Sequence, residues 1–291
     1  MNWIEDIQVI IFDLDGTLYQ DHSFMYRYLN YMVDGGPHEP YKADILQDLN
    51  NILQGQHPCK IGNFYYVPNK LCFHHDNEKV IAAYTWQGER SQDWDYTNTE
   101  LLTSMEDVIY VGDSWSVLHV LAQFYGISKE KRQEAFMAVR RDMVGNSHAI
   151  QKHEQVIRLV RELGTKYRKI LMTNSQKEAA EGFVSFLGLE NAFDEITFGG
   201  EKPYGLEGRI KQLVQEENIA PHQIVSIGDH AWNDLYPVRR SGGRTVFISP
   251  YRSYDTNKWD LQLTSMDELA QFIESLQQRT TEGMTVDIIT K

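Results

Sequence analysis

The fold is decided by Gln8-Val9-Ile10-Ile11-Phe12 and by the segment that follows it, Asp13-Leu14-Asp15-Gly16-Thr17. The first segment is a short apolar run rich in β-branched side chains, which is typical of a buried strand. The run ends abruptly in acidic residues and a glycine, which indicates a polar turn. We therefore predict a buried strand that presents Asp13 and Asp15 at its carboxyl end.

Later apolar runs repeat this pattern, and helical patterns lie between them. The runs are 169–172 before Thr173-Asn174-Ser175, 224–227 before Gly228-Asp229, and 245–248, and the helical patterns are 153–163, 177–187 and 206–217. Strands that alternate with helices form right-handed βαβ units and a mainly parallel sheet covered on both faces. We therefore predict an α/β fold with a Rossmann-like parallel sheet core. Its site is expected at the carboxyl ends of the strands.

The stretch from 21 to 147 breaks this alternation, because it is rich in aromatic residues and turn signals and mixes helical with extended patterns. We interpret it as an inserted, mainly helical domain. The expected elements are helices at 24–33, 115–125 and 129–144 and a strand at 64–67. The catalytic core then comprises 1–20 and 148–278, with a closing helix at 266–276 and a polar tail at 279–291.

Composition limits the partners of the chain. A formal net charge of −13 argues against a nucleic acid polymer and against an anionic membrane surface. A small anion can still bind where a metal ion, a lysine and backbone N–H groups reverse the local field. Two cysteines, Cys59 and Cys72, are too few for a disulfide framework, and no zinc-binding spacing is present. Since no signal-like or membrane-spanning apolar run is found either, a cytoplasmic protein is expected.

Polar residues near the predicted strand ends fall into four groups. They are Asp13 with Asp15, Thr173 with Asn174, Lys202 with Pro203, and Asp229 with Asp234. Carboxylate oxygens suit Mg²⁺, which takes few protein ligands and retains room for a substrate phosphate. The metal and Lys202 can offset carboxylate repulsion, while the Thr173 hydroxyl and backbone N–H groups hold phosphoryl oxygens. The groups together predict a phosphate receptor with a magnesium site.

These groups, in this order, resemble the four motifs of the haloacid dehalogenase (HAD) superfamily. The matching segments are Asp13-Leu14-Asp15-Gly16-Thr17-Leu18, Thr173-Asn174, Lys202-Pro203 and Gly228-Asp229 through Asp234. Any one motif alone is weak, but four in order near predicted strands are specific. The resemblance covers the first strand and about 147–276, and it implies that the insert is a cap domain placed after the first motif.

The resemblance also implies a role for each motif residue. Asp13 would be the nucleophile that forms an aspartyl-phosphate, and Asp15 the general acid/base. Thr173 would hold the phosphoryl group, and Lys202 would steady Asp13 and the transferring charge. Asn174 is a further candidate for contact with phosphate or cap. The metal ligands would be Asp13, the carbonyl of Asp15, Asp229, and Asp234 either directly or in the outer shell.

The expected function is Mg²⁺-dependent hydrolysis of a small phosphorylated metabolite, a phosphomonoester. An acid at position 15 favours phosphoryl transfer, since relatives that cleave carbon–halogen bonds look different there. Two alternatives stay open, namely a phosphomutase of the same chemistry and a catalytically idle binding or regulatory protein. The cap would select the substrate, although it carries no recognised motif.

Several other patterns have plainer interpretations. Val111-Gly112-Asp113-Ser114 imitates the strand-Gly-Asp pattern but lacks a second acid, so we interpret it as cap structure. His74-His75-Asp76 resembles a metal cluster without a distant partner, which favours a solvated loop. His230 and Trp232 are interpreted as ordinary loop residues. The aromatic residues Trp86, Trp94, Tyr96 and Trp115 more often fill a core than stack on a base or sugar.

Overall fold

The computed structural model describes residues 2–92, 94, 107–145, 148–164 and 166–289, with side chains described as far as 278. Their contacts divide the chain into two compact units. The first unit comprises Met1–Asp21, Val144–Pro250 and Trp259–Lys291, and the second comprises His22–Met143 and Tyr251–Lys258. The predicted boundary residue Ser147 lies outside the described residues.

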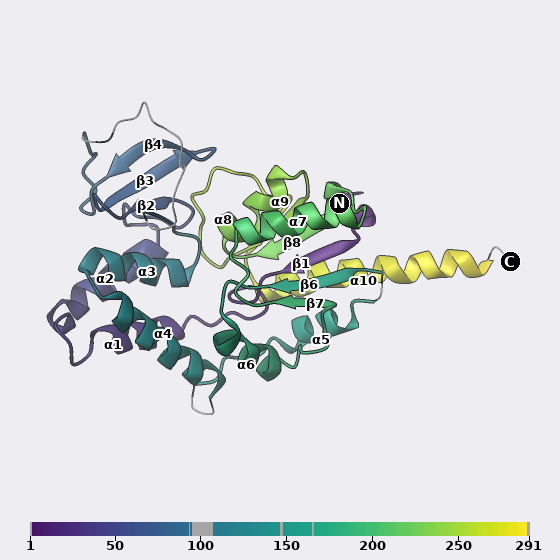
Figure 1. Cartoon of the computed structure of the whole chain (residues 1–291), viewed down its shortest axis with the longest axis horizontal. Coiled ribbons are helices and arrows are strands. Elements are labelled where there is room, and N and C mark those ends of the chain that lie inside the picture. The colour runs from purple at the N-terminus through teal and green to yellow at the C-terminus, as the bar shows by residue number, and fades with distance from the viewer. Residues whose placement is uncertain (1, 93, 95–106, 146–147, 165, 290–291) are drawn as a thin grey trace. The chain divides into compact units, whose positions relative to one another are not determined.

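The first unit is built on a six-stranded parallel sheet with the order β10-β9-β8-β1-β6-β7 (Figure 1). The strands are β1 Val9–Phe12, β6 Arg168–Met172, β7 Glu195–Thr197, β8 Ile224–Gly228, β9 Arg244–Ile248 and β10 Leu261–Leu263. The four predicted strands are confirmed. The two edge strands β7 and β10 escaped prediction because each has three residues and is only partly buried.

Helices cover both faces of this sheet, and in the view of Figure 1 α7 lies in front of the strands and α10 behind them. The helical elements of this unit are η1 Asn2–Asp6, α5 Glu154–Glu162, α6 Lys177–Leu187, α7 Tyr204–Glu216, η3 Pro221–Gln223, α8 Ala231–Asp234, α9 Tyr236–Arg240 and α10 Met266–Ile289. The polar tail expected from 279 is helical as far as Ile289, since no proline interrupts 277–289.

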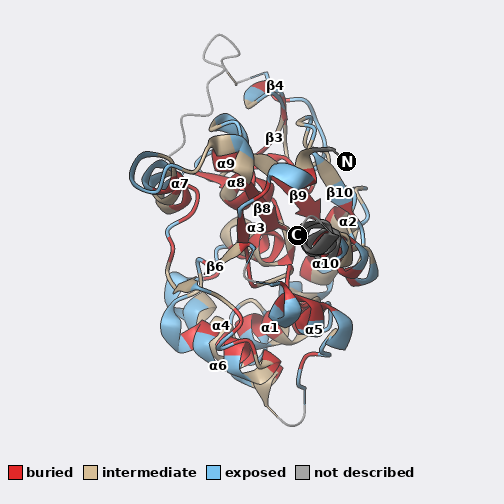
Figure 2. Cartoon of the chain, turned by 90° about the vertical axis from the view of Figure 1, so that its right-hand side faces the viewer, coloured by how far each residue is buried: buried red, intermediate tan, exposed pale blue. Residues whose placement is uncertain are grey.

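Strand β1 lies inside the sheet between β8 and β6 and is fully buried. Figure 2 shows the neighbouring strand β8 in red, as buried. The β1 residues Val9 and Ile11 pack with Leu206 and Ile210 of α7 in one apolar cluster. Each such buried aliphatic side chain contributes about 1.5–3 kcal/mol. Burial on both faces therefore explains the continuous apolar run that precedes Asp13.

The register of β1 decides what its carboxyl end meets. Phe12 is opposite Leu171 of β6 on one side and Ile227 of β8 on the other. All three strands run in the same direction, so the residues that follow them converge at one edge of the sheet. In open α/β sheets this edge, where crossovers leave on opposite sides, is where ligands bind.

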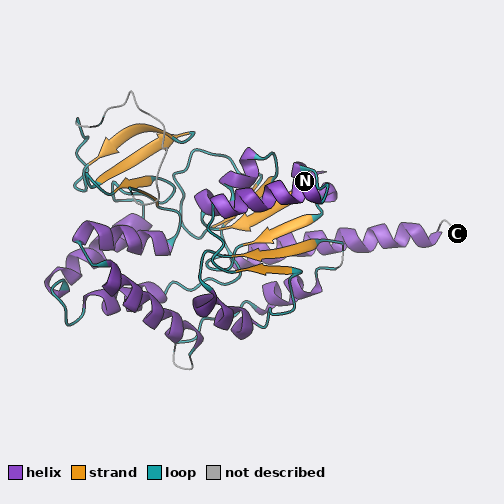
Figure 3. Ribbon diagram, viewed as in Figure 1, coloured by secondary structure: helices purple, strands orange, loops and turns teal. Residues whose placement is uncertain are grey.

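The second unit combines helices with a four-stranded antiparallel sheet of order β4-β3-β2-β5 (Figure 3). Its elements are α1 Phe24–Val33, η2 Glu39–Tyr41, α2 Lys42–Leu53, β2 Phe64–Tyr66, β3 Leu71–Asp76, β4 Lys79–Tyr84, β5 Val108–Tyr110, α3 Ser114–Tyr125 and α4 Lys129–Val144. The hairpin β3–β4 turns at Asn77 and Glu78, whose φ angles are +47° and +67°. The sequence lacks the usual glycine at this turn, so the hairpin was not predicted.

The segment Tyr251–Lys258 follows β9 in sequence but belongs to the second unit. Its Tyr254 N–H donates to the Ile61 carbonyl at 2.7 Å, and the Tyr110 hydroxyl donates to Asp255 at 2.6 Å. A Cβ on Gly62, where φ is +89°, would lie 2.3 Å from the Asp255 nitrogen. The glycine therefore permits a close backbone approach that no local sequence pattern announced.

None of the helices in the described part of the chain combines the length and apolar character that a membrane crossing requires.

Candidate active site

Asp13 stands directly after β1 and is held there by its own backbone, because its N–H donates to the Ile227 carbonyl at 3.0 Å. The Lys202 ammonium donates to Asp13 Oδ1 at 2.7 Å and to Asp234 Oδ1 at 2.6 Å. All three side chains are buried. Because a buried charge is costly unless it is paired, this triad is an arrangement that the fold has to maintain.

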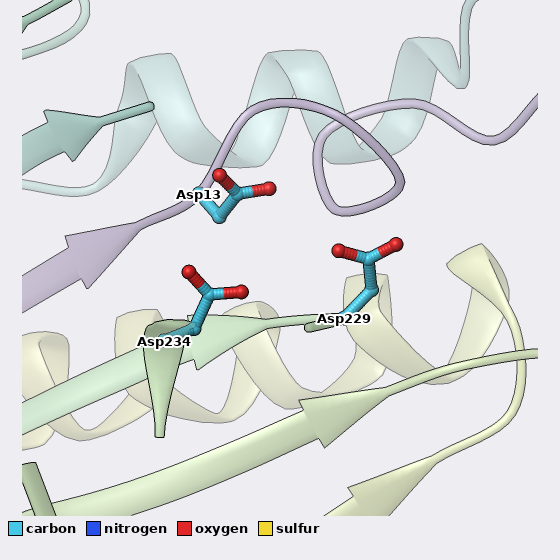
Figure 4. A group of neighbouring side chains, drawn as sticks. All are labelled: Asp13, Asp229 and Asp234. Carbon is cyan, nitrogen blue, oxygen red and sulfur yellow. The ribbon is translucent and has the colours of Figure 1, made fainter. Parts of the chain in front are cut away.

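Asp229 completes an acidic cluster with Asp13 and Asp234 (Figure 4). Each of the three offers one carboxylate oxygen, and these oxygens lie within 4.8 Å of one another. A Cβ on Gly16, where φ is +80°, would lie 1.9 Å from Asp229 Oδ2, so the turn after β1 can close on Asp229 only with glycine at this position.

The donor set fits a hard divalent cation. Its ligand atoms are carboxylate oxygens, which Mg²⁺ prefers. The three ionised carboxylates and the one ammonium of Lys202 leave two negative charges in a largely buried place, and a divalent cation would balance them. The residues present therefore suit Mg²⁺ in both chemistry and charge.

Burial and the neighbouring charges shift the pKa values of Asp13 and Lys202. Burial raises the pKa of Asp13 to about 7, Asp234 and Asp15 add to the rise, and Lys202 opposes it. For Lys202, burial acts against the ammonium, but Asp13 and Asp234 outweigh it and hold the pKa above its usual range. Lys202 thus stays charged, and without a cation Asp13 is partly protonated at neutral pH.

Asp15 has different surroundings from Asp13, although only Leu14 separates them in sequence. Its Oδ2 accepts from the Ser175 hydroxyl at 2.8 Å, and its Oδ1 accepts from the hydroxyl of Tyr19. Its carboxylate does not belong to the cluster formed by Asp13, Asp229 and Asp234 among the described residues. A metal contact of Asp15 would therefore come from its backbone carbonyl, as the motif implies.

Thr173 and Asn174 follow β6, on the other side of β1 from Asp229. The buried Thr173 donates its N–H to the Thr197 carbonyl at 3.0 Å. The Asn174 amide donates to the Lys202 carbonyl at 3.0 Å and accepts the Lys202 N–H at 2.6 Å. Asn174 therefore fixes the backbone that carries Lys202, and its contact with phosphate stays a prediction.

Three hydroxyl residues of this site were not predicted from the sequence. Ser175 and Tyr19 contact Asp15, and the Thr17 hydroxyl donates to Asp13 Oδ2 at 3.3 Å. All three lie inside or beside the quoted motifs, so adjacency to Asp13 and Thr173 was the available signal. The contacts of Thr17 and Tyr19 are local to the turn after β1, whereas that of Ser175 with Asp15 requires β1 and β6 to be paired.

His230 and Trp232, interpreted as loop residues, lie at and within a short helix. His230 Nδ1 accepts from the Asn233 N–H at 3.3 Å at the start of α8, and the His230 N–H donates to Asp234 Oδ2 at 3.1 Å. Trp232 is buried and packs against Tyr236. The loop interpretation is wrong for Trp232, which lies within α8. His230 lies in the loop before α8, as expected, and its side chain caps that helix.

The histidine pair of the second unit is not a solvated loop, and that expectation is wrong. His74 and His75 lie in β3, and their Nε2 atoms are hydrogen-bonded to the carbonyls of Pro58 and Gly62 at 2.9 and 2.8 Å. These ring nitrogens are hydrogen-bonded to backbone carbonyls, and buried polar groups usually have such partners.

Among the aromatic residues, Trp86 stacks on Phe124 and Trp115 on Phe24 at 3.9 and 4.0 Å between ring centroids. Trp94 lies 4.4 Å from Phe73 by the same measure. These contacts support the core interpretation. Tyr96 lies outside the described residues.

The chain belongs to the haloacid dehalogenase-like hydrolases, because the family model of that name matches residues 7–242. The class that the parallel sheet and its strand-end acids define is therefore a HAD hydrolase, as the motifs predicted. No curated protein sequence matches the chain significantly.

Solved structures share this fold at low identity. A predicted phosphoglycolate phosphatase from Haemophilus somnus 129pt is 14% identical, with a TM-score of 0.51 over 92% of this chain and 98% of that one. The putative HAD-hydrolase YfnB from Bacillus subtilis, bound to magnesium, is also 14% identical, with a TM-score of 0.51 over 92% and 99%. A dehalogenase is 13% identical, with a TM-score of 0.46 over 91% and 96%. At these identities the likeness concerns the fold alone.

Proposed function

We propose that this chain is a Mg²⁺-dependent phosphomonoester hydrolase that passes the phosphoryl group through an aspartyl-phosphate on Asp13. The observation that carries the proposal is the buried triad of Asp13, Lys202 and Asp234 beside Asp229. A nucleophilic carboxylate, a fixed ammonium and a set of metal-binding oxygens meet there at one edge of the sheet.

In the first step, an Asp13 oxygen attacks phosphorus, and the bond from phosphorus to the leaving oxygen breaks. Asp15 gives its proton to that oxygen, so the product alcohol leaves neutral. Lys202 and the Thr173 hydroxyl stabilise the charge on the phosphoryl oxygens as it develops.

In the second step, Asp15 takes a proton from a water molecule, and the water oxygen attacks phosphorus. The bond between phosphorus and Asp13 breaks, which releases inorganic phosphate and leaves Asp13 as a carboxylate and Asp15 protonated, as both were at the start of the cycle.

Asp13, Asp229 and the carbonyl of Asp15 would hold the Mg²⁺, with Asp234 as a ligand or an outer-shell partner. When bound, the ion would act as a Lewis acid that offsets the negative charge of the phosphoryl oxygens. An anionic substrate could then approach a group of carboxylates. The partner is a small phosphorylated metabolite, and we assign its selection to the second unit as the cap.

Asp15 is the residue that favours phosphate esters over carbon–halogen substrates. An alkoxide leaving group needs a proton from a nearby acid, whereas a halide does not. The retained carboxylate, held by two hydroxyls, is therefore the feature that supports phosphoryl transfer.

The test is hydrolysis of an aryl phosphate by the purified chain with Mg²⁺, with added chelator, and by Asp13→Asn. We expect phosphate release that the chelator stops and that Asp13→Asn lacks. The matched control is Asp6→Asn, since Asp6 is exposed in η1 of the same unit. Turnover by Asp13→Asn at the rate of Asp6→Asn would reject the covalent role. On a second substrate, a phosphate ester that carries a free hydroxyl, formation of a phosphate isomer without phosphate release would identify a phosphomutase.

A further inference from the structure

Asp13 and Asp15 have hydrogen-bond partners of different chemical kinds. Asp13 accepts from the Lys202 ammonium at 2.7 Å, a group that can only donate while it is charged, and at a longer distance of 3.3 Å from the Thr17 hydroxyl. Asp15 accepts from the hydroxyls of Ser175 and Tyr19, one on each carboxylate oxygen. A hydroxyl can donate a hydrogen bond or accept one. The two acids are therefore equipped for different tasks.

We propose that Tyr19 and Ser175 are positioning residues that hold the Asp15 carboxyl group in its working place throughout the catalytic cycle. This inference rests on the proposed function, in which Asp15 gives a proton in one step and takes one in the next. Tyr19 and Ser175 neither gain nor lose a proton in this scheme.

Both hydroxyls are themselves fixed by the fold. Tyr19 is buried, pairs with Asp15 in an isolated bridge across the turn, and stacks on Phe183 of α6 with 5.3 Å between ring centroids. Ser175 donates its N–H to the Thr173 hydroxyl at 3.1 Å, and its carbonyl accepts from the Gly199 N–H at 2.9 Å. Partners from the turn after β1 and from the end of β6 thus reach Asp15 from two separate segments.

The hydroxyls suit a group that alternates between two forms. When Asp15 is a carboxylate, both hydroxyls donate to it. When it carries a proton, the carboxyl O–H can donate to one hydroxyl oxygen, whose own hydrogen turns away. A lysine in the same place could not accept. The Asp15 group therefore keeps two partners in both forms, without a change of position.

This role makes a prediction that depends on the leaving group. The value of kcat/KM covers the steps up to transfer of the phosphoryl group to Asp13. An alkyl phosphate needs a well-placed acid for that transfer, whereas an aryl phosphate has a stable leaving group and needs little help. Loss of positioning should therefore lower kcat/KM for the alkyl ester more than for the aryl ester.

The experiment measures kcat/KM on one alkyl and one aryl phosphate for Tyr19→Phe and Ser175→Ala, at saturating Mg²⁺. We expect the alkyl-to-aryl ratio to fall about tenfold or more in each variant, because general acid catalysis contributes about 10²–10⁴-fold. The matched controls are Tyr204→Phe, whose ring is exposed, and Ser185→Ala, whose hydroxyl donates to the exposed Glu190; both should keep the wild-type ratio. Ser175→Thr retains the hydroxyl and should restore most of the ratio.

Equal losses on both esters, or an unchanged alkyl rate, would overturn the positioning role while leaving the proposed function intact. So would a Ser175→Thr ratio as low as that of Ser175→Ala. Absence of hydrolysis in the wild-type chain would instead reject the proposed function, and the positioning role with it. The thermal unfolding of each variant shows whether a loss common to both esters comes from misfolding.

Discussion

Two segments of the chain share a strand-Gly-Asp pattern and use it differently. In the second unit, Asp113 follows β5, and its carboxylate caps α3 by accepting the Ser116 N–H at 2.7 Å. In the first unit, Asp229 follows β8 and shares a cluster with Asp13 and Asp234. The same local sequence therefore makes a helix cap in one place and a candidate metal site in the other.

The direction of the neighbouring strands explains this difference. β5 is antiparallel to β2, so that Tyr110 at its end is opposite Phe64 at the start of β2. β8 is parallel to β1, so that Ile227 and Phe12 end side by side and the acids after them meet. A parallel sheet gathers strand ends, whereas an antiparallel pair separates them. Topology, and not the dipeptide, decides which aspartate can do chemistry.

Replacement of the two aspartates by alanine should give the largest contrast. Asp229→Ala is expected to lower phosphate release at least about 100-fold and to weaken Mg²⁺ binding, because it removes a proposed metal ligand. Asp113→Ala removes a helix cap and should cost about 0.5–2 kcal/mol of stability. Kinetics, Mg²⁺ titration and urea unfolding of both variants test this. Unaltered Mg²⁺ affinity in Asp229→Ala would contradict the metal assignment.

Lys202→Met should have the largest effect on stability. It removes the ammonium that pairs with two buried carboxylates, and breaking a buried ion pair costs about 3–5 kcal/mol. Lys211→Met, at an exposed position of α7, is the matched control and should change stability little. Urea unfolding in the presence of chelator measures both. Equal stability of the two variants would show that the triad is not formed.

Gly62→Ala tests the close approach of 251–258 in the second unit. The added Cβ meets backbone at 2.3 Å and also suffers an unfavourable φ of +89°. Gly126, with a φ of +75° and open space around it, provides a control for the φ effect alone. We expect Gly126→Ala to cost about 1–2 kcal/mol, and Gly62→Ala to cost more. Equal melting temperatures would argue against the contact.

The pH dependence follows from the pKa of Asp13, which burial raises to about 7 from 3.8. Between these values the metal-free folded state binds more protons than the unfolded state, so Asp13 makes stability fall as pH rises from about 4 to about 7. Above that range its contribution is constant.

Mg²⁺ competes with the Asp13 proton, so its affinity should fall about tenfold for each pH unit below about 7. Calorimetric titration of the chain with Mg²⁺ at several values between about pH 5.5 and 8 measures the effect, because Asp13 gains or loses its proton in this range. An affinity that is independent of pH would exclude Asp13 as a ligand that must lose a proton.

Much of the candidate site could be predicted from sequence, because most of its parts have a local signature. An apolar run predicts the strand, and the polar residues at its end predict the turn, as at Asp13 and Asp229. The parallel arrangement follows from the alternation of strands and helices. For the same reason Thr173 could be named before its strand was seen beside β1. Lys202, which follows the unpredicted strand β7, could be named only from the order of the motifs.

The remaining features depend on contacts between segments far apart in sequence. The role of Asn174 in holding the Lys202 backbone, and that of Ser175 beside Asp15, require β1, β6 and the segment before α7 to be in place. The position of 251–258 in the second unit depends on Gly62, which approaches the Asp255 nitrogen although the two residues are far apart in sequence. Short edge strands such as β7 have too few residues to show a period.

The central claim is tested most directly by trapping the phosphorylated chain. The wild-type protein is mixed with an aryl phosphate and Mg²⁺, quenched in acid during turnover, digested and examined by mass spectrometry. We predict one added phosphoryl group on the peptide that contains Asp13, and none in Asp13→Asn. A phosphoryl group on another residue, or active turnover with no modified peptide at any quench time, would contradict the account.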